Sequence, residues 1–135
     1  MPGTLLQIAD GLEARLATIS GLRVFDHVPD VFAAPCAFVL PDAIEFWQAF
    51  QSGTPEVTFT VTVVVGRASE RTAQKALYEF MSFSGDRSIR AAIEGDRSLG
   101  GVVQTCITES AQNIRMVQQD SQSFLAADVT VRVYA

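Results

Sequence analysis

Hydrophobic and polar residues alternate most regularly between residues 57 and 65. The apolar side chains occupy every second position: Val57, Phe59, Val61, Val63 and Val65. Threonines stand between the first four of them. Because successive side chains of a strand point to opposite faces, this pattern predicts a strand with one buried face and one half-polar face.

The C-terminal part of the chain repeats the pattern. Residues 103–108 and residues 125–133 both alternate between apolar and polar side chains, which predicts two further strands. The stretch between them is rich in Gln, Asn, Ser and Asp. We therefore expect a long hairpin whose tip spans residues 112–122.

Three segments show apolar residues at helical spacing instead. Thr4 begins the first in a capping-box pattern, and Gly21 is expected to stop it. Ser69 is the expected N-cap of the second, which ends near residue 85. Its apolar stripe consists of Ala73, Ala76, Leu77, Phe80 and Met81. The third helix is short and lies between Ser88 and Gly95.

Two short strands are predicted at residues 22–28 and 36–40. Consecutive strands with short connections pair antiparallel, whereas the helical crossover from Val65 to Val102 allows a parallel pair. The predicted fold is therefore α+β: a single mixed, mainly antiparallel β-sheet with two main helices and one short helix packed on one face.

Composition limits the possibilities further. The 135 residues form one domain, residues 1–135, without a second core. No apolar run approaches the ~20 residues of a membrane span, and the N-terminus lacks the basic leader of a signal peptide. Without an export signal, Cys36 and Cys106 are expected to be buried, reduced thiols. The net charge of −5 argues against a protein that reads nucleic-acid sequence, because such proteins are usually basic.

The motifs indicate neither catalysis nor a cofactor or metal. The order strand, Gly66, helix is that of many phosphate sites, but "VGRASERT" lacks the second glycine and the lysine of a P-loop. His27 is the only histidine, and with two distant cysteines it does not make the usual zinc site. The carboxylates are scattered, which leaves a glycosidase-type pair open. We expect no catalytic residue, and interpret Gly66 as a turn.

Two segments carry side chains that the folding of a monomer does not explain. Phe46, Trp47 and Phe50 cluster in a predicted loop or hairpin arm, and Arg115 and Met116 lie in the predicted hairpin tip. Aromatic residues, Arg and Met are enriched at the centres of interfaces. We expect these residues to contact other subunits or a tube; the alternatives are rings that fold back onto the core and a solvated tip.

Three stretches carry a family resemblance: "LQIADGLEARLATISGLRVFDHVPD", "TFTVTVVVGRASERTAQKAL" and "IRAAIEGDRSLGGVVQTC". They resemble the tail terminator (tail-completion) proteins of siphophages, particularly those that infect actinobacteria. The resemblance covers nearly the whole chain. Its most specific parts are "VGRASERTAQ" and "AAIEGDRSLGGVVQTC".

The resemblance implies a structural protein that is not an enzyme. Members of this family are α+β subunits that form a ring, commonly a hexamer, on the last ring of the major tail tube protein. The ring ends tube polymerisation and joins the tail to the head-completion (neck) proteins, while DNA passes through its lumen without sequence-specific binding. The implied location is the tail–neck junction of the virion, with assembly in the host cytoplasm and no membrane partner.

Two other interpretations stay open. Another phage neck component, such as a head-closure or connector subunit, would share the ring symmetry but dock elsewhere. A monomeric ligand-binding or enzymatic α+β domain would have a pocket with convergent polar groups near His27 or the glycine turns. The assembly protein is instead expected to have apolar patches on two opposite sides.

Overall fold

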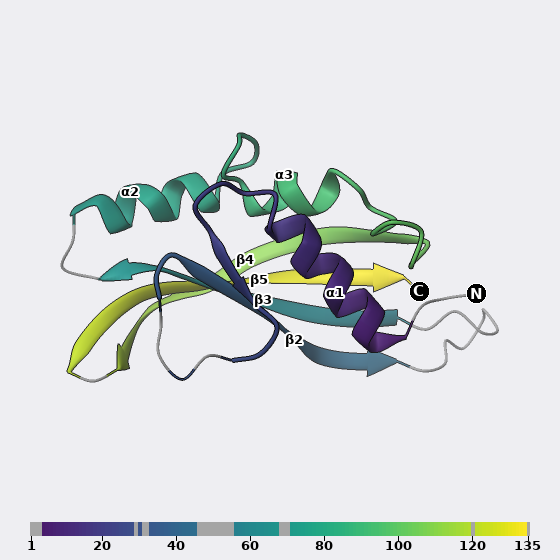
Figure 1. Cartoon of the computed structure of the whole chain (residues 1–135), viewed down its shortest axis with the longest axis horizontal. Helices are drawn as coiled ribbons and strands as arrows, with labels where there is room; N and C mark the ends of the chain where they lie inside the picture. The colour runs from purple at the N-terminus through teal and green to yellow at the C-terminus, as the bar shows by residue number, and fades with distance from the viewer. Residues whose placement is uncertain are drawn as a thin grey trace.

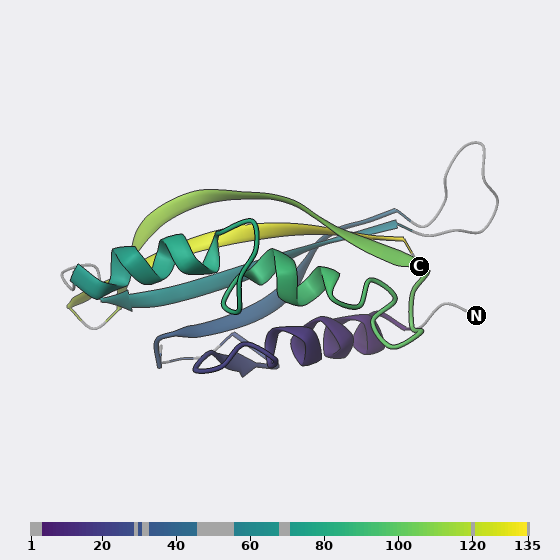
Figure 2. The ribbon, with the colours of Figure 1, turned by 90° about the horizontal axis from the view of Figure 1, so that it is seen from above.

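The computed structural model describes residues 4–28, 30, 33–45, 56–67, 71–119 and 121–134. Eight elements follow one another: α1 (Leu5–Leu16), β1 (Arg23–Phe25), β2 (Cys36–Glu45), β3 (Glu56–Arg67), α2 (Arg71–Phe80), α3 (Ile89–Glu94), β4 (Thr105–Gln119) and β5 (Gln122–Tyr134). The described strands form one mixed sheet in the order β1–β2–β3–β5–β4 (Figure 1). The three helices lie along one side of it (Figure 2), as predicted for an α+β fold.

Local capping interactions fix the ends of two helices. The Thr4 hydroxyl accepts a hydrogen bond from the Gln7 N–H at 3.2 Å, and the Gln7 side chain accepts one from the Thr4 N–H at 2.9 Å. This capping box starts α1 as expected. The Ser88 hydroxyl accepts from the Ala91 N–H at 3.1 Å and starts α3, whose predicted bounds are confirmed. The predicted cap at Ser69 lies outside the described residues.

Both long helices end earlier than expected. α1 ends at Leu16, and Gly21, with a φ of 86°, instead turns the chain into β1. α2 ends at Phe80, well before Gly85.

The core lies between the helices and the sheet. The odd-numbered side chains of β3 from Val57 to Val65 are buried there, which confirms the predicted alternation, and the odd-numbered side chains of β5 from Ala127 to Val133 join them. α1 covers β2, while α2 covers β3 and β5. A smaller apolar cluster lies outside this core: Cys36, Phe38, Val64, Phe124 and Ala126.

The pairing of the strands differs from the prediction in two places. β5 lies between β3 and β4 and pairs antiparallel with both, so the helical crossover does not create a parallel pair. β5 takes this central place because its apolar face is nearly continuous. The parallel pair is β1 with β2, for which antiparallel pairing was expected. Residues 26–35 are long enough to return the chain to the end at which β1 begins.

Two strands are longer than their apolar patterns. β2 continues past residue 40 to Glu45, and β4 continues through the polar stretch to Gln119. The expected tip at 112–122 was therefore wrong in extent, since Gln119 pairs with Gln122. Polar side chains fit here because these strand ends are exposed to solvent. Gly66 lies within β3 at a shift of register against β5, so its interpretation as the turn was also wrong.

The placement of α1 generates a test of the core. Leu12 is 0% exposed, so Leu12→Ala is expected to lower the free energy of unfolding by about 2–5 kcal/mol. Leu6, on the same helix, is 71% exposed, and Leu6→Ala should change that free energy by about 0.5 kcal/mol or less. Urea unfolding followed by circular dichroism measures both. Equal losses would contradict the described packing of α1.

Candidate functional site

The sheet face opposite the helices carries an ordered polar array. We call it the open face, and its polar side chains come from β3, β4 and β5: Glu56, Thr62, Glu109, Gln112, Asp128, Thr130 and Arg132. None of the helices that the structure describes covers this face. It is therefore a surface that is available to a partner.

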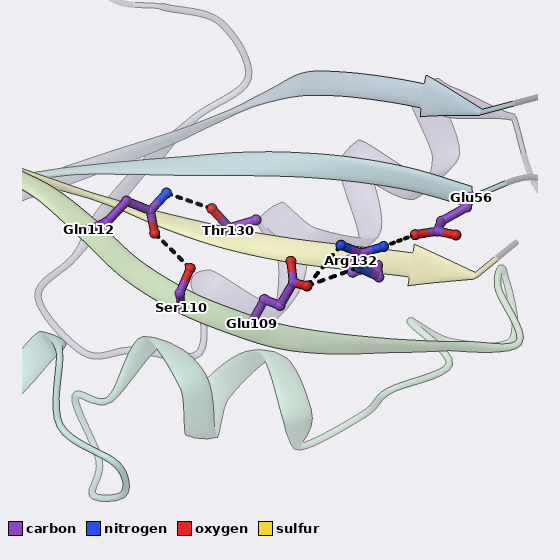
Figure 3. Close-up of polar contacts among 6 residues, drawn as sticks. All are labelled: Glu56, Glu109, Ser110, Gln112, Thr130 and Arg132. Carbon is purple, nitrogen blue, oxygen red and sulfur yellow. Dashed lines mark hydrogen bonds and ion pairs between the residues drawn. The ribbon is translucent and has the colours of Figure 1, made fainter.

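Arg132 joins three strands of the open face (Figure 3). Its guanidinium donates hydrogen bonds to Glu109 of β4 at 2.8 and 3.1 Å, and it also donates one to Glu56 of β3. These bonds raise the pKa of Arg132, those to Glu109 contributing most. Because the Glu56 carboxylate is largely buried, the bridge compensates a charge that would otherwise be costly.

Asp128 is the centre of a second set of contacts. Its carboxylate accepts hydrogen bonds from the Thr62 hydroxyl at 3.0 Å and the Asn113 amide at 2.9 Å, and it forms an ion pair with Arg115 at 3.1 Å. A further chain runs from Ser110 through Gln112 to Thr130, with distances of 2.8 and 2.7 Å (Figure 3). These side chains hold one another in place, which suits a structural surface better than a reacting centre.

The charges within the ion pairs of the open face nearly balance. Its ion pairs include three carboxylates, those of Glu56, Glu109 and Asp128, and two guanidiniums, those of Arg115 and Arg132. Three negative and two positive charges leave one net negative charge. Such a surface gives phosphate groups little attraction.

The outer edge of β4 is the second candidate surface. Within the described part of the chain, only β5 pairs with β4, so the other side of its backbone has no strand partner. Near its start, Glu94 of α3 accepts a hydrogen bond from the Thr108 N–H at 3.0 Å. Arg97 and Arg90 contact the same carboxylate at 3.1 and 3.5 Å. Burial alone would raise the pKa of Glu94, but these contacts outweigh it and lower the pKa.

Beyond this cap, β4 carries two exposed apolar side chains within its polar stretch. Ile114 is 58% exposed and Met116 is 69% exposed, and both border a hollow of about 370 Å³ beneath α2. Tyr78 and Leu77 of α2 and Leu125 of β5 line the same hollow. Exposed side chains of this size on an unpaired edge strand are typical of an association site.

The opposite side of the sheet has an open edge as well. β1 pairs with β2 only at Cys36–Phe38, so residues 39–45 have β3 on one side and no other described strand beside them. We call residues 39–45 the β2 edge. Leu40 is 48% exposed there, and Asp42 and Glu45 are exposed too. The expectation of apolar patches on two opposite sides stays a prediction: the β2 edge has one exposed apolar side chain of this size, Leu40, beside two carboxylates.

The structure places the predicted interface residues in different surroundings. Met116 lies on the β4 edge in an exposed position, as an interface residue would. Arg115 is half-buried and turns to Asp128 and the Asn113 carbonyl on the open face. Phe46, Trp47 and Phe50 lie outside the described residues.

The two cysteines and the histidine differ in their surroundings. Cys36 and Cys106 are free and buried, and burial raises the pKa of both thiols, that of Cys106 to about 11. His27 is exposed and contacts Asp26 at 2.6 Å. Among the described residues, no group of three or more His, Cys, Asp or Glu side chains could hold a metal ion.

A hollow of about 630 Å³ lies beside Gly66 and α2. Arg67, Lys75 and Arg87 line it, so it is the feature that a monomeric ligand-binding protein would use. Arg87, however, already contacts Glu79 at 3.4 Å and stacks on the Phe80 ring, 4.7 Å from its centroid.

Comparison with known proteins does not assign this chain to a family: no protein-family model matches it, and no curated protein matches it significantly. The helices described in the structure are too short or too polar for any of them to cross a bilayer.

Sequence reasoning missed the residues that organise both surfaces. The alternation of Asp128, Thr130 and Arg132 did place them together on a polar face. Their partner Glu109 was missed because the predicted strand stopped at residue 108. The capping role of Glu94 depends on a contact between α3 and β4, and the sequence around Glu94 does not predict that contact.

The bond between Glu94 and Thr108 predicts that the free energy of unfolding depends on pH. Glu94→Gln should lower the free energy of unfolding at pH 7 by about 1–2 kcal/mol, because it weakens the bonds to Thr108, Arg97 and Arg90. The pKa of Glu94 in the folded state lies below its ordinary 4.5. The extra stability is therefore present above pH 4.5 and is lost as the pH falls through the folded pKa. Urea unfolding at several pH values should show the two proteins converging in acid.

Glu79→Gln is the matched control. The Glu79 carboxylate is 42% exposed and pairs with Arg87 at 3.4 Å, so its loss should cost about 0.5 kcal/mol or less at any pH. A stability gap for Glu94→Gln that stays constant down to strongly acid pH would contradict the described cap.

Proposed function

We propose that this chain is the subunit of a siphophage tail terminator ring, which ends the tail tube and joins it to the neck. The observation that carries the proposal is the pair of open sheet edges, the β4 edge on one side and the β2 edge on the other. A ring needs two different faces on opposite sides of each subunit, so that every copy contacts its two neighbours differently. A monomer with two such edges would be prone to associate.

The residues of the family resemblance support the same conclusion. The segment "AAIEGDRSLGGVVQTC" contains Glu94, the glycines before β4 and the first residues of β4 itself. These residues build the corner from which the β4 edge begins, with Glu94 bonded to Thr108. The resemblance therefore falls on the framework of a proposed subunit contact.

The open face suits the lumen of such a ring. Its side chains are already bonded to one another, and its ion pairs leave a small negative charge. The chain as a whole carries a net charge of −5. Like charge disfavours binding to phosphates, so DNA would slide past this surface without sticking.

The two alternatives differ in what they would bind. A head-closure or connector subunit would also form a ring but would not recognise the end of a tail tube. A monomeric ligand-binding domain would use the hollow beside Gly66, with Arg67, Lys75 and Arg87 as groups for an anion.

The test is capping of tail tubes. Terminator-deficient tubes of an actinobacterial siphophage are mixed with the purified protein and viewed by electron microscopy. We expect density at one end of each tube and no further elongation after tube protein is added. Absence of end binding at every concentration would contradict the proposal. Binding to the neck complex alone would favour a connector subunit, and anion binding without capping would favour the monomeric domain.

Met116→Asp probes the surface that carries the proposal. Met116 is 69% exposed, so the free energy of unfolding should change by about 0.5 kcal/mol or less. Capping should weaken by about tenfold or more, because a carboxylate would be buried without a partner in the subunit contact. Met116→Leu, which keeps the side chain apolar, is the control and should cap normally. Equal capping by both variants would exclude Met116 from the contact.

A further inference from the structure

We propose that neighbouring copies of this chain join edge to edge, with the β2 edge of one copy pairing antiparallel with β4 of the next. The sheet would then continue from subunit to subunit around the ring. This inference rests on the ring proposed above and specifies the interface that builds it.

Both partners of this contact have a free backbone side within the described chain. The β2 edge is covered by β3 on one side only, because β1 stops opposite Phe38. β4 is paired with β5 on one side, and Glu94 caps its outer side at Thr108. From residue 109 to residue 119 no described strand lies beyond it. Adding a strand to such an edge satisfies its backbone groups.

The strand directions favour this pairing. β2 runs antiparallel to β3, β3 antiparallel to β5, and β5 antiparallel to β4. β2 and β4 therefore point in opposite directions in the same sheet. A second copy whose Leu40 lies opposite Val117 brings its β2 edge beside β4 in antiparallel orientation. Within one sheet Leu40 is level with Ser110, so this copy is displaced along the strands by about seven residues (117 − 110). A closed ring with that displacement has strands that are inclined to the ring axis. The alternation of strand directions continues across the contact without a break.

The apolar side chains match in one register. Leu40 lies beside Thr60 on the open face, and Val117 packs on that same face beside Phe124. With Leu40 opposite Val117, the bulge between Gln112 and Arg115 brings Ile114 beside the neighbour's Ile44. Ile44 and Ile114 both lie on the helix face of their strands. Apolar side chains thus meet on both faces of the joined sheet.

The charges match in that register too. Glu45 comes opposite Gln112, and Asp42, at the bulge of the β2 edge, lies near Arg115. The β2 edge carries two exposed carboxylates and no basic residue. Arg115 is the basic side chain in this part of β4, and its side chain is 35% exposed although it pairs with Asp128. An acidic strand therefore meets a strand that offers a guanidinium, which favours correct pairing over other contacts.

Irregularities on both edges make the contact selective. Pro41 has no backbone N–H to donate, and the β2 edge and β4 are both interrupted by shifts of register. Such features protect edges from indiscriminate pairing. The strand pairing between copies therefore includes few backbone hydrogen bonds. Much of the binding free energy comes from burial of Leu40, Ile44, Ile114 and Val117.

Cysteine cross-linking tests the register. The variant Leu40→Cys/Val117→Cys is assembled, in solution or on tail tubes, and treated with a mild oxidant. Disulfides form only when the Cα atoms lie within about 7 Å, so we expect at least about tenfold more cross-linked protein than with either single variant. A denaturing gel should show a ladder that ends at the number of subunits in the ring. Cys36 and Cys106 are buried and remain as an unreactive background.

Leu40→Cys/Ile107→Cys is the control, because Ile107 is also exposed on β4 but lies far from Val117 along the strand. It should give no ladder. Should the first double variant fail to fold, as circular dichroism would reveal, Ile44→Cys/Ile114→Cys tests the same register.

The outcomes separate the two proposals. Closed rings or tube caps without a ladder from either Leu40/Val117 or Ile44/Ile114 would overturn the edge pairing and leave the ring intact. A ladder from the Ile107 control alone would overturn the register. A product that stops at the dimer, or a wild-type protein that forms neither rings nor caps, would overturn the ring and the edge pairing together.

Discussion

The structure depends on one constraint: the three described helices bury the apolar face of the sheet. The odd-numbered side chains of β3 and β5 lie against that helix layer and exclude water. Burial of this kind is the main stabilising term in a domain of this size. The described helices leave the opposite face and the two edges of the sheet uncovered, and the polar groups there need other partners.

The open face is stabilised by bonds among its own side chains. Arg132 bridges Glu109 and Glu56, and Asp128 binds Thr62, Asn113 and Arg115. These contacts join β3, β5 and β4 without help from a helix. Among the described residues, no other strand pairs with the outer sides of β4 and of residues 39–45, although Glu94 caps β4 at Thr108. The edges are therefore where the proposed assembly begins.

Much of the fold could be predicted from local pattern. Alternation located the buried faces of β3 and β5, and the caps at Thr4 and Ser88 gave correct helix starts. These features depend on neighbours in the sequence, so the sequence displays them directly. The class of fold follows from them.

The pairing of strands that are distant in the sequence was harder to predict. The central position of β5 and the parallel pair of β1 with β2 depend on which strands compete best for partners, and alternation alone does not encode that. The extension of β4 was missed because a strand exposed to solvent can be as polar as a loop. Of the candidate site, Met116 was selected from the sequence by its residue type, and its interface role stays a prediction. The roles of Glu109 and Glu94 are visible only in the three-dimensional contacts.

The proposed account makes assembly the function of this chain, and its most direct test is the mass and shape of the wild-type protein. Light scattering over a wide concentration range, combined with electron-microscope class averages of the free protein and of capped tubes, gives both quantities. We predict a closed ring with a DNA-sized lumen, either free or on the tube end. A protein that stays monomeric in solution and leaves tube ends bare would contradict the account.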